Sequence, residues 1–202
     1  MLLELAVIVI GYLLGSIPSA YIVARLRKGV DIREVGVGNM GAANTFREIG
    51  VWEGIVVLLV DTAKGAATIL IARALGVSQP WLLGAGFAVL LGHNFPVFLG
   101  FRGGKGSATA VGIFLLLAPR ETGIALGITA IPLLITRNAH NVAVALGIGF
   151  IFIPLLIWLF QKSAVLALYS LAFVIFICLR SVSSPEEIRT ALVRLKNRNT
   201  SG

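Results

Sequence analysis

Residues 2–24 read LLELAVIVIGYLLGSIPSAYIVA, an apolar run in which Glu4 is the one charged residue. The hydrocarbon core of a bilayer is about 30 Å thick, and a helix of about 20 apolar residues crosses it. A helix is favoured in lipid because it satisfies its own backbone hydrogen bonds. The run therefore predicts a membrane-spanning helix.

The rest of the chain has the same apolar character. Hydrophobic residues make up 57% of its 202 residues and charged residues 13%, whereas a soluble domain carries about 25% charged residues. We therefore expect an all-α fold, a polytopic membrane helical bundle of about seven transmembrane segments in a single domain over 1–202. With 2–24, the apolar segments are 52–73, 80–100, 107–119, 122–136, 142–160 and 163–180.

Two of these segments, 107–119 and 122–136, are short for a full crossing. They predict either two short tilted helices or a re-entrant hairpin, with the change of direction near Pro119. Both alternatives return the chain to the side that it left, so they do not alter the sidedness of the later segments.

The 17 Lys and Arg residues are divided unevenly between the two sides of such a bundle. Most lie in the 25–51 connection, after the third and fifth segments, and in the tail, whereas the opposite side has Arg73, Arg120 and Lys162. Basic connections remain in the cytoplasm. We therefore expect the N-terminus outside and the C-terminus cytoplasmic, and we attribute the net charge of +8 to topology and not to nucleic-acid binding.

The tail predicts a helix of its own. Ser184 suits an N-cap, Pro185 the first helical position and Glu187 the third, which is the pattern of a capping box. Apolar residues then recur on one face, so we expect an amphipathic cytoplasmic helix over 184–198 on the membrane surface. A solvated charged tail is the alternative.

Residues 36–41, GVGNMG, match the G-x-G-x-x-G pattern of dinucleotide-binding loops. That pattern requires a preceding strand, whereas here a membrane helix and a basic patch precede it. We interpret the segment as a loop that holds a polyol phosphate, with amides for hydroxyls and a guanidinium for phosphate. A structural loop that caps the bundle is the alternative. The candidate binding residues are Gly38, Asn39, Gly41, Asn44 and Arg47.

A second polar stretch, 92–109, reads GHNFPVFLGFRGGKGSAT. Its glycines allow backbone N–H groups to converge on an anion, and a helix N-terminus and two cations add positive charge. It lacks the spacing of a Walker A loop. We expect a phosphate site, with a tight basic turn as the alternative. The candidate residues are His93, Asn94, Arg102, Gly103, Gly104, Lys105, Gly106 and Ser107.

Asp61 and Lys64 lie three residues apart inside the second span, on one helical face. An intramembrane ionisable pair is a candidate for function, but we interpret this one as a self-neutralising structural pair. Two histidines and one cysteine provide no metal-binding spacing, so we expect no metal and no cofactor.

The chain resembles the PlsY family of bacterial membrane acyltransferases in nearly its whole length. The resemblance rests on GYLLGSIP at 11–18, Gly38-Asn39, Asp61-x-x-Lys64-Gly65 and, above all, 92–109. It implies transfer of an acyl group from acyl-phosphate to glycerol 3-phosphate, which gives lysophosphatidate for phospholipid synthesis. It also implies a multi-pass protein of the bacterial plasma membrane with its site facing the cytoplasm.

The resemblance also implies roles for single residues. Lys105, Ser107 and the loop glycines would bind phosphate and stabilise an oxyanion. His93 and Asn94 would orient the glycerol hydroxyl, with a substrate phosphate as the base. The glycerol phosphate would be held by Arg47, Asn39 and Asn44.

Three positions depart from the family pattern. Val37 replaces a serine of the first motif, and Ser184 and Glu187 replace the histidine and asparagine of the third. A divergent paralogue with another acceptor, or a non-catalytic lipid- or phosphate-binding protein, is therefore the alternative function. A small transporter is a further class, but only Asp61 and Lys64 suggest a polar path through the bilayer.

Overall fold

The computed structural model describes residues 1–136 and 142–182, and every regular element in these residues is a helix. The all-α expectation is confirmed for this part of the chain. The tail helix expected over 184–198 lies outside it. The α-helices are α1 (Leu2–Ser16), α2 (Ser19–Lys28), α3 (Ala42–Glu48), α4 (Val51–Ala74), α5 (Gln79–Asn94), α6 (Ser107–Leu117), α7 (Pro119–Thr136), α8 (Val142–Gln161) and α9 (Ala164–Val182), with short 3₁₀ turns at Ile32–Glu34 and Val97–Leu99.

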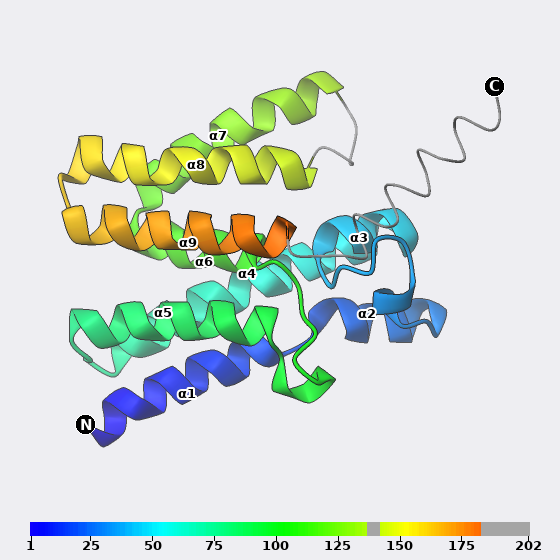
Figure 1. The fold of residues 1–202 in the computed structure, drawn as a ribbon, viewed down its shortest axis with the longest axis horizontal. Helices are drawn as coiled ribbons and strands as arrows, with labels where there is room; N and C mark the ends of the chain where they lie inside the picture. Colours follow the sequence, from blue (N-terminus) through cyan, green and yellow to red (C-terminus); the bar gives the residue numbers. More distant parts are fainter. Residues whose placement is uncertain (137–141, 183–202) are drawn as a thin grey trace.

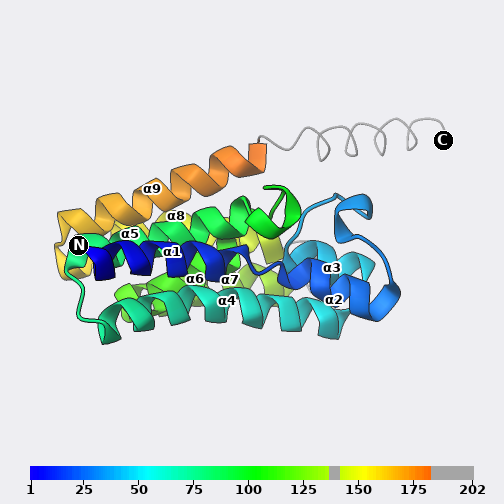
Figure 2. The ribbon, with the colours of Figure 1, turned by 90° about the horizontal axis from the view of Figure 1, so that it is seen from below.

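The long helices lie side by side in a bundle, and the irregular segments gather at one end of it (Figures 1 and 2). The α2 and α3 helices, the 29–41 loop and the 95–106 loop are at this end, and so is the C-terminal end of α9. The N-terminus lies at the opposite end, together with the α4–α5, α6–α7 and α8–α9 connections. The two glycine-rich stretches therefore share one end of the bundle.

Four helical segments in the described residues are long and apolar enough to cross a membrane: Leu2–Lys28, Val51–Ala74, Gln79–Leu99 and Ala164–Ser181. Large apolar side chains such as Leu59, Leu168 and Leu179 are exposed on their outer surfaces. Such surfaces are unfavourable in water and suit lipid. The α6 helix, with 11 residues, is too short to cross about 30 Å of hydrocarbon perpendicular to its plane.

The first apolar run is not one continuous helix. It divides at Ile17 and Pro18 into α1 and α2, because proline has no N–H to donate and disfavours helical backbone in the residue before it. Ile17 accordingly has extended backbone, with φ −60° and ψ 115°. The break frees carbonyl groups at the end of α1 in the interior of the bundle.

Glycines allow the closest helix crossings in the bundle. The α1 helix packs along α5, and α4 packs along α6. A Cβ atom added to Gly15 would overlap the Val89 carbonyl, and one added to Gly92 would overlap the Tyr12 carbonyl. Such small residues let helix backbones approach closely in membranes, where association depends on packing.

We expect Gly92→Ala to lower the free energy of unfolding by about 1–3 kcal/mol, because overpacking forces backbone shifts. The measurement is thermal or denaturant unfolding in detergent micelles. Gly127→Ala is the matched control, since a Cβ atom there meets nothing within 4 Å. Equal stability of the two variants would show that the α1–α5 crossing tolerates the added methyl group.

Aromatic side chains fill the interior between α5, α6 and α9. Phe173 packs edge-on against Phe114 at 5.2 Å and against Phe87 at 5.6 Å between ring centroids. Phe114 and Phe173 are both fully buried. This rigid core holds the polar ends of α5 and α6 in place beside the glycine-rich loops.

Candidate functional site

An open cleft lies where the two glycine-rich stretches meet α4 and α5. Six residues that the sequence singled out for the site line it, and Asp61, which we had interpreted as structural, lines it as well. The cleft thus brings together segments that are far apart in the chain. Its lining residues are Asn39, Gly41, Ala42, Ala43, Leu58, Asp61, His93, Lys105, Gly106, Ser107 and Ala108.

The N-terminus of α6 forms one wall of the cleft. Gly106 precedes the helix with φ +89°, a left-handed conformation that glycine adopts without strain. The first N–H groups of a helix have no acceptor within it and carry partial positive charge. Because Ser107 and Ala108 begin α6 and Lys105 adds a cation, this wall suits an anion.

The N–H groups of Gly103 and Gly104 have acceptors within the protein. The N–H of Gly103 donates to the Asn94 carbonyl, and the N–H of Gly104 donates to the His93 carbonyl, each at 3.1 Å. A Cβ atom on Gly104 would overlap His93 Nε2. These glycines therefore fasten the loop to the end of α5 and leave room for the imidazole.

The 29–41 loop is held from within by Asn44. Its side-chain oxygen accepts from the Val37 N–H at 3.2 Å, and its amide donates to the carbonyls of Val35 at 3.0 Å and Ile32 at 3.3 Å. Asn44 is fully buried. In this structure it shapes the loop that carries Asn39 and Gly41 to the cleft, and it does not itself line the cleft.

Arg33 joins the 29–41 loop to the other glycine-rich stretch. It donates to both carboxylate oxygens of Asp31 within its own loop, and its Nη1 donates to the Leu99 carbonyl at 3.3 Å. The hydrogen bonds from Arg33 hold the pKa of the Asp31 carboxyl below its ordinary value, and the same contact raises the pKa of Arg33. The pair therefore contributes its full stability above pH of about 4 and loses it as pH falls through the lowered pKa.

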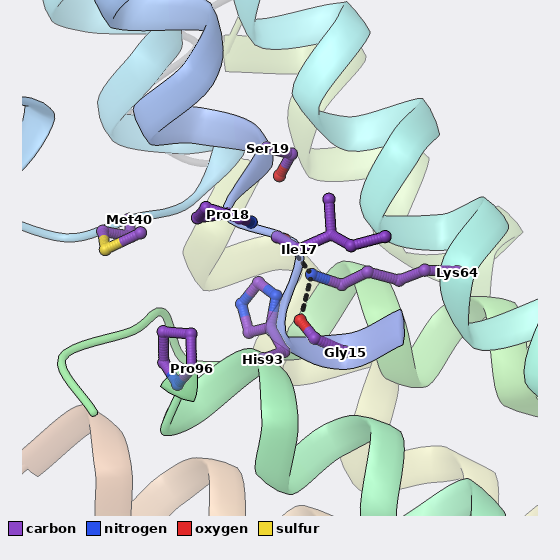
Figure 3. Close-up of a pocket in the computed structure, with 8 residues that line it drawn as sticks. All are labelled: Gly15, Ile17, Pro18, Ser19, Met40, Lys64, His93 and Pro96. Carbon is purple, nitrogen blue, oxygen red and sulfur yellow. Dashed lines mark hydrogen bonds between the residues drawn. The ribbon is translucent and has the colours of Figure 1, made fainter. Parts of the chain in front are cut away.

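Asp61 and Lys64 belong to a larger buried network, part of which Figure 3 shows. Lys64 Nζ lies 2.9 Å from Asp61 Oδ1 and donates to the carbonyls of Gly15 at 3.0 Å and Ile17 at 3.3 Å. These carbonyls lie at the break between α1 and α2. The pair thus links α4 to the break between α1 and α2, and it also reaches the cleft through Asp61.

Two further groups approach the same carboxylate oxygen. The Ser19 hydroxyl donates to Asp61 Oδ1 at 2.7 Å, and His93 Nδ1 lies 3.6 Å from it. His93 lines the cleft and also a smaller cavity, which Figure 3 shows beside Met40 and Pro96. The imidazole therefore lies beside both hollow regions and next to the buried charges, of which Asp61 lines the cleft and Lys64 the smaller cavity.

Arg180 is a residue that sequence reasoning counted only as a topology signal. From the end of α9 its Nε donates to Asn94 Oδ1 at 3.2 Å, and its guanidinium lies 4.9 Å from the centroid of the Phe95 ring. Asn94 also donates to the Leu90 carbonyl at 2.9 Å. Asn94 thus links α9 to α5. No local pattern in the sequence could indicate this contact, because it joins residues 86 positions apart.

The other predicted binding residues are near the site but do not line the cleft. Arg47 Nε donates to the Ala43 carbonyl at 3.1 Å, one turn earlier in α3. Arg102 is exposed, and Gly38 forms a turn with the Val35 carbonyl. In the residues that the structure describes, no group of His, Cys, Asp or Glu could hold a metal ion.

Comparison with known proteins gives a consistent set of relatives. The family model described as glycerol-3-phosphate acyltransferase matches residues 5–190. Glycerol-3-phosphate acyltransferase 1 of Dehalococcoides mccartyi is 43% identical over 181 residues, which cover 87% of this chain and 86% of that protein. The Geobacter sulfurreducens glycerol-3-phosphate acyltransferase is 49% identical over 59% of this chain and 61% of its own length.

Solved structures show the same fold. The crystal structure of PlsY, an integral membrane glycerol 3-phosphate acyltransferase, in its glycerol 3-phosphate form has a TM-score of 0.81 and 32% identity, covering 93% of this chain and 92% of that one. The lysophosphatidic acid form has a TM-score of 0.78 and covers 94% and 92%. The similarity thus extends over nearly the whole chain, including both glycine-rich stretches.

Proposed function

We propose, because this chain belongs to the glycerol-3-phosphate acyltransferase family, that it transfers an acyl group from acyl-phosphate to glycerol 3-phosphate and releases lysophosphatidate and inorganic phosphate. The observation that carries this proposal is the cleft that Lys105 and the α6 N-terminus line together with Asn39 and Gly41. A cleft that combines an anion-binding wall with an amide suits two phosphorylated substrates, one of them a polyol.

The chemistry requires no covalent enzyme intermediate. An acyl-phosphate is a mixed anhydride, so its carbonyl carbon is already activated toward a hydroxyl. The acceptor hydroxyl oxygen bonds to this carbon, the bond from the carbon to the phosphate oxygen breaks, and the hydroxyl proton leaves with the phosphate. The protein aligns the two substrates and stabilises the charge that develops on the carbonyl oxygen.

We assign the groups of the α6 wall to the donor. Lys105 neutralises the acyl-phosphate, and the N–H groups of Ser107 and Ala108 stabilise the oxyanion. Asn39 binds the glycerol hydroxyls, and Arg47 turns its guanidinium to the glycerol phosphate. This assignment gives each phosphate a cationic side chain and gives the glycerol hydroxyls a neutral amide.

We propose seven membrane segments, with α1 and α2 together as the first and α4 to α9 as the others, of which the short α6 helix crosses only part of the hydrocarbon. The N-terminus would be outside, and the cleft would face the cytoplasm of a bacterial plasma membrane. The bundle end at the N-terminus carries the connections that contain or adjoin Arg73, Arg120 and Lys162. The other end carries the more basic connections, as cytoplasmic ends do.

The experiment that tests the function supplies the purified protein with palmitoyl-phosphate and glycerol 3-phosphate. We expect lysophosphatidate and inorganic phosphate in equal amounts. Palmitate and phosphate without lysophosphatidate would indicate hydrolysis, and tight binding of glycerol 3-phosphate without turnover would favour a non-catalytic member. Either result would contradict the proposal.

A divergent member with another acceptor is the second candidate, and Val37 is the observation that favours it. The residue has no hydroxyl, and its hydrogen bond to Asn44 at 3.2 Å uses the backbone N–H. The other departures, Ser184 and Glu187, lie outside the described residues. Turnover with a different phosphorylated alcohol at a higher kcat/KM than with glycerol 3-phosphate would support this candidate.

We expect Asn44→Ala to raise the KM for glycerol 3-phosphate by about tenfold, because buried backbone groups of the 29–41 loop lose partners worth about 1–3 kcal/mol. The measurement is the initial rate against acceptor concentration. Glu34→Ala, an exposed change in the same loop, is expected to leave KM unchanged. An unaltered KM in Asn44→Ala would show that the loop keeps its shape without these bonds.

A further inference from the structure

The buried carboxylate of Asp61 lines the cleft that we assign to the acyl transfer. We propose that it accepts a hydrogen bond from the terminal hydroxyl of the acceptor and so determines which hydroxyl faces the acyl carbon. The inference rests on the proposed function for the identity of the acceptor. It gives a specificity-determining contact to a residue that the sequence analysis interpreted as structural.

The arrangement of contacts around Asp61 supports this role. Ser19, Lys64 and His93 all approach the same oxygen, Oδ1, at 2.7, 2.9 and 3.6 Å. Because these three contacts all engage Oδ1, we place the acceptor hydroxyl at the other carboxylate oxygen, Oδ2. Asp61 is the one carboxylate among the described residues that line the cleft.

The surrounding charges favour a hydroxyl at this position. Lys64 compensates the negative charge of Asp61 inside the bundle, so the carboxylate is retained without a substrate cation. The donor phosphate is assigned to the α6 wall, where Lys105 and the helix N-terminus lie, and the acceptor phosphate to Arg47. A carboxylate repels phosphate and accepts strongly from O–H. The cleft therefore orients the acceptor with its hydroxyl toward α4 and its phosphate away from Asp61.

The position of Asp61 on α4 agrees with this orientation. Leu58 lines the cleft three residues earlier on the same helical face. An apolar neighbour and near-complete burial limit the water around the Asp61 side chain, so an acceptor hydroxyl competes with little solvent there. The Asp61 contact aligns the hydroxyl, and the proton still leaves with the phosphate of the donor.

The test compares two phosphate esters that differ by one hydroxyl group, 3-hydroxypropyl phosphate and propyl phosphate. Their dissociation constants are measured by calorimetry on the purified full chain in detergent. We expect the wild type to bind the hydroxyl compound about 10- to 100-fold more tightly, as for a hydrogen bond to a charged acceptor. In Asp61→Asn the ratio is expected to fall by about tenfold.

Ser19→Ala is the matched control, because it removes a donor from Oδ1 and leaves Oδ2 in place. Its ratio is expected to stay within about threefold of the wild type. The Asp61→Asn/Lys64→Met double variant removes both buried charges. If Asp61→Asn alone does not fold, the ratio of the two dissociation constants is measured in this double variant. If Asp61 is only structural, its substitution weakens the binding of both compounds equally and leaves the ratio of their dissociation constants unchanged.

An unchanged ratio in both Asp61 variants would overturn the inference, and so would a wild type that does not distinguish the two compounds. Failure of the proposed function has a different signature. If the wild type forms no lysophosphatidate but its ratio depends on Asp61, the acyl transfer is wrong and the hydroxyl contact is supported.

Discussion

Lys105→Ala is expected to lower kcat/KM for acyl transfer by about 100- to 1,000-fold, the usual cost of removing a group that stabilises transition-state charge. Lys105 lines the cleft beside the N-terminus of α6, where we place the acyl-phosphate. The alanine removes its ammonium group but leaves the helix N-terminus intact. The measurement is the initial rate of lysophosphatidate formation over a range of palmitoyl-phosphate concentrations.

Arg102→Ala is the matched control, because Arg102 is a cation of the same loop that is exposed and does not line the cleft. We expect it to lose no more than a fewfold in kcat/KM. Equal losses in the two variants would mean that the loop acts through its overall charge. No loss in Lys105→Ala would contradict the assignment of the α6 wall to the donor.

The sequence predicted the position of the site better than the function of each residue in it. The glycine spacing around Lys105 indicates an anion-binding loop wherever it folds, and the structure places Lys105, Gly106 and Ser107 in the cleft. Spacing does not reveal which N–H groups a fold already uses. Gly103 and Gly104 donate theirs to the end of α5.

Asp61 shows a second limit of sequence reasoning. Helical periodicity places it on one face with Lys64, but does not tell which other helices that face meets. The contacts to Ser19 and His93 arise from positions 42 and 32 residues away. Asn44 shows the converse, since a polar residue beside a glycine loop suggested ligand binding and the fold uses it to shape the loop.

The membrane helices show a third limit of sequence reasoning. Hydropathy predicted the long spans because about 20 apolar residues suffice to cross a bilayer. It did not predict the division at Pro18, because proline is tolerated in membrane helices where neighbouring groups satisfy the freed carbonyls. Here the neighbouring group is the ammonium of Lys64, which comes from α4.

Lys64→Met is expected to lower the free energy of unfolding by about 3–5 kcal/mol, the cost of leaving one partner of a buried ion pair uncompensated. Lys64 is buried and contacts Asp61, and it also donates to two carbonyls at the α1–α2 break. Methionine matches the length of the lysine stem but supplies no donor. The measurement is unfolding in detergent micelles.

Comparison with the Asp61→Asn/Lys64→Met double variant separates the two contributions of Lys64. If the ion pair dominates, the double variant is more stable than Lys64→Met, because no buried charge is left without a partner. If the carbonyls of Gly15 and Ile17 dominate, both variants are equally destabilised, since both lose the donor that caps α1. A Lys64→Met protein as stable as the wild type would contradict both roles, and the break at Pro18 would then need another source of stability.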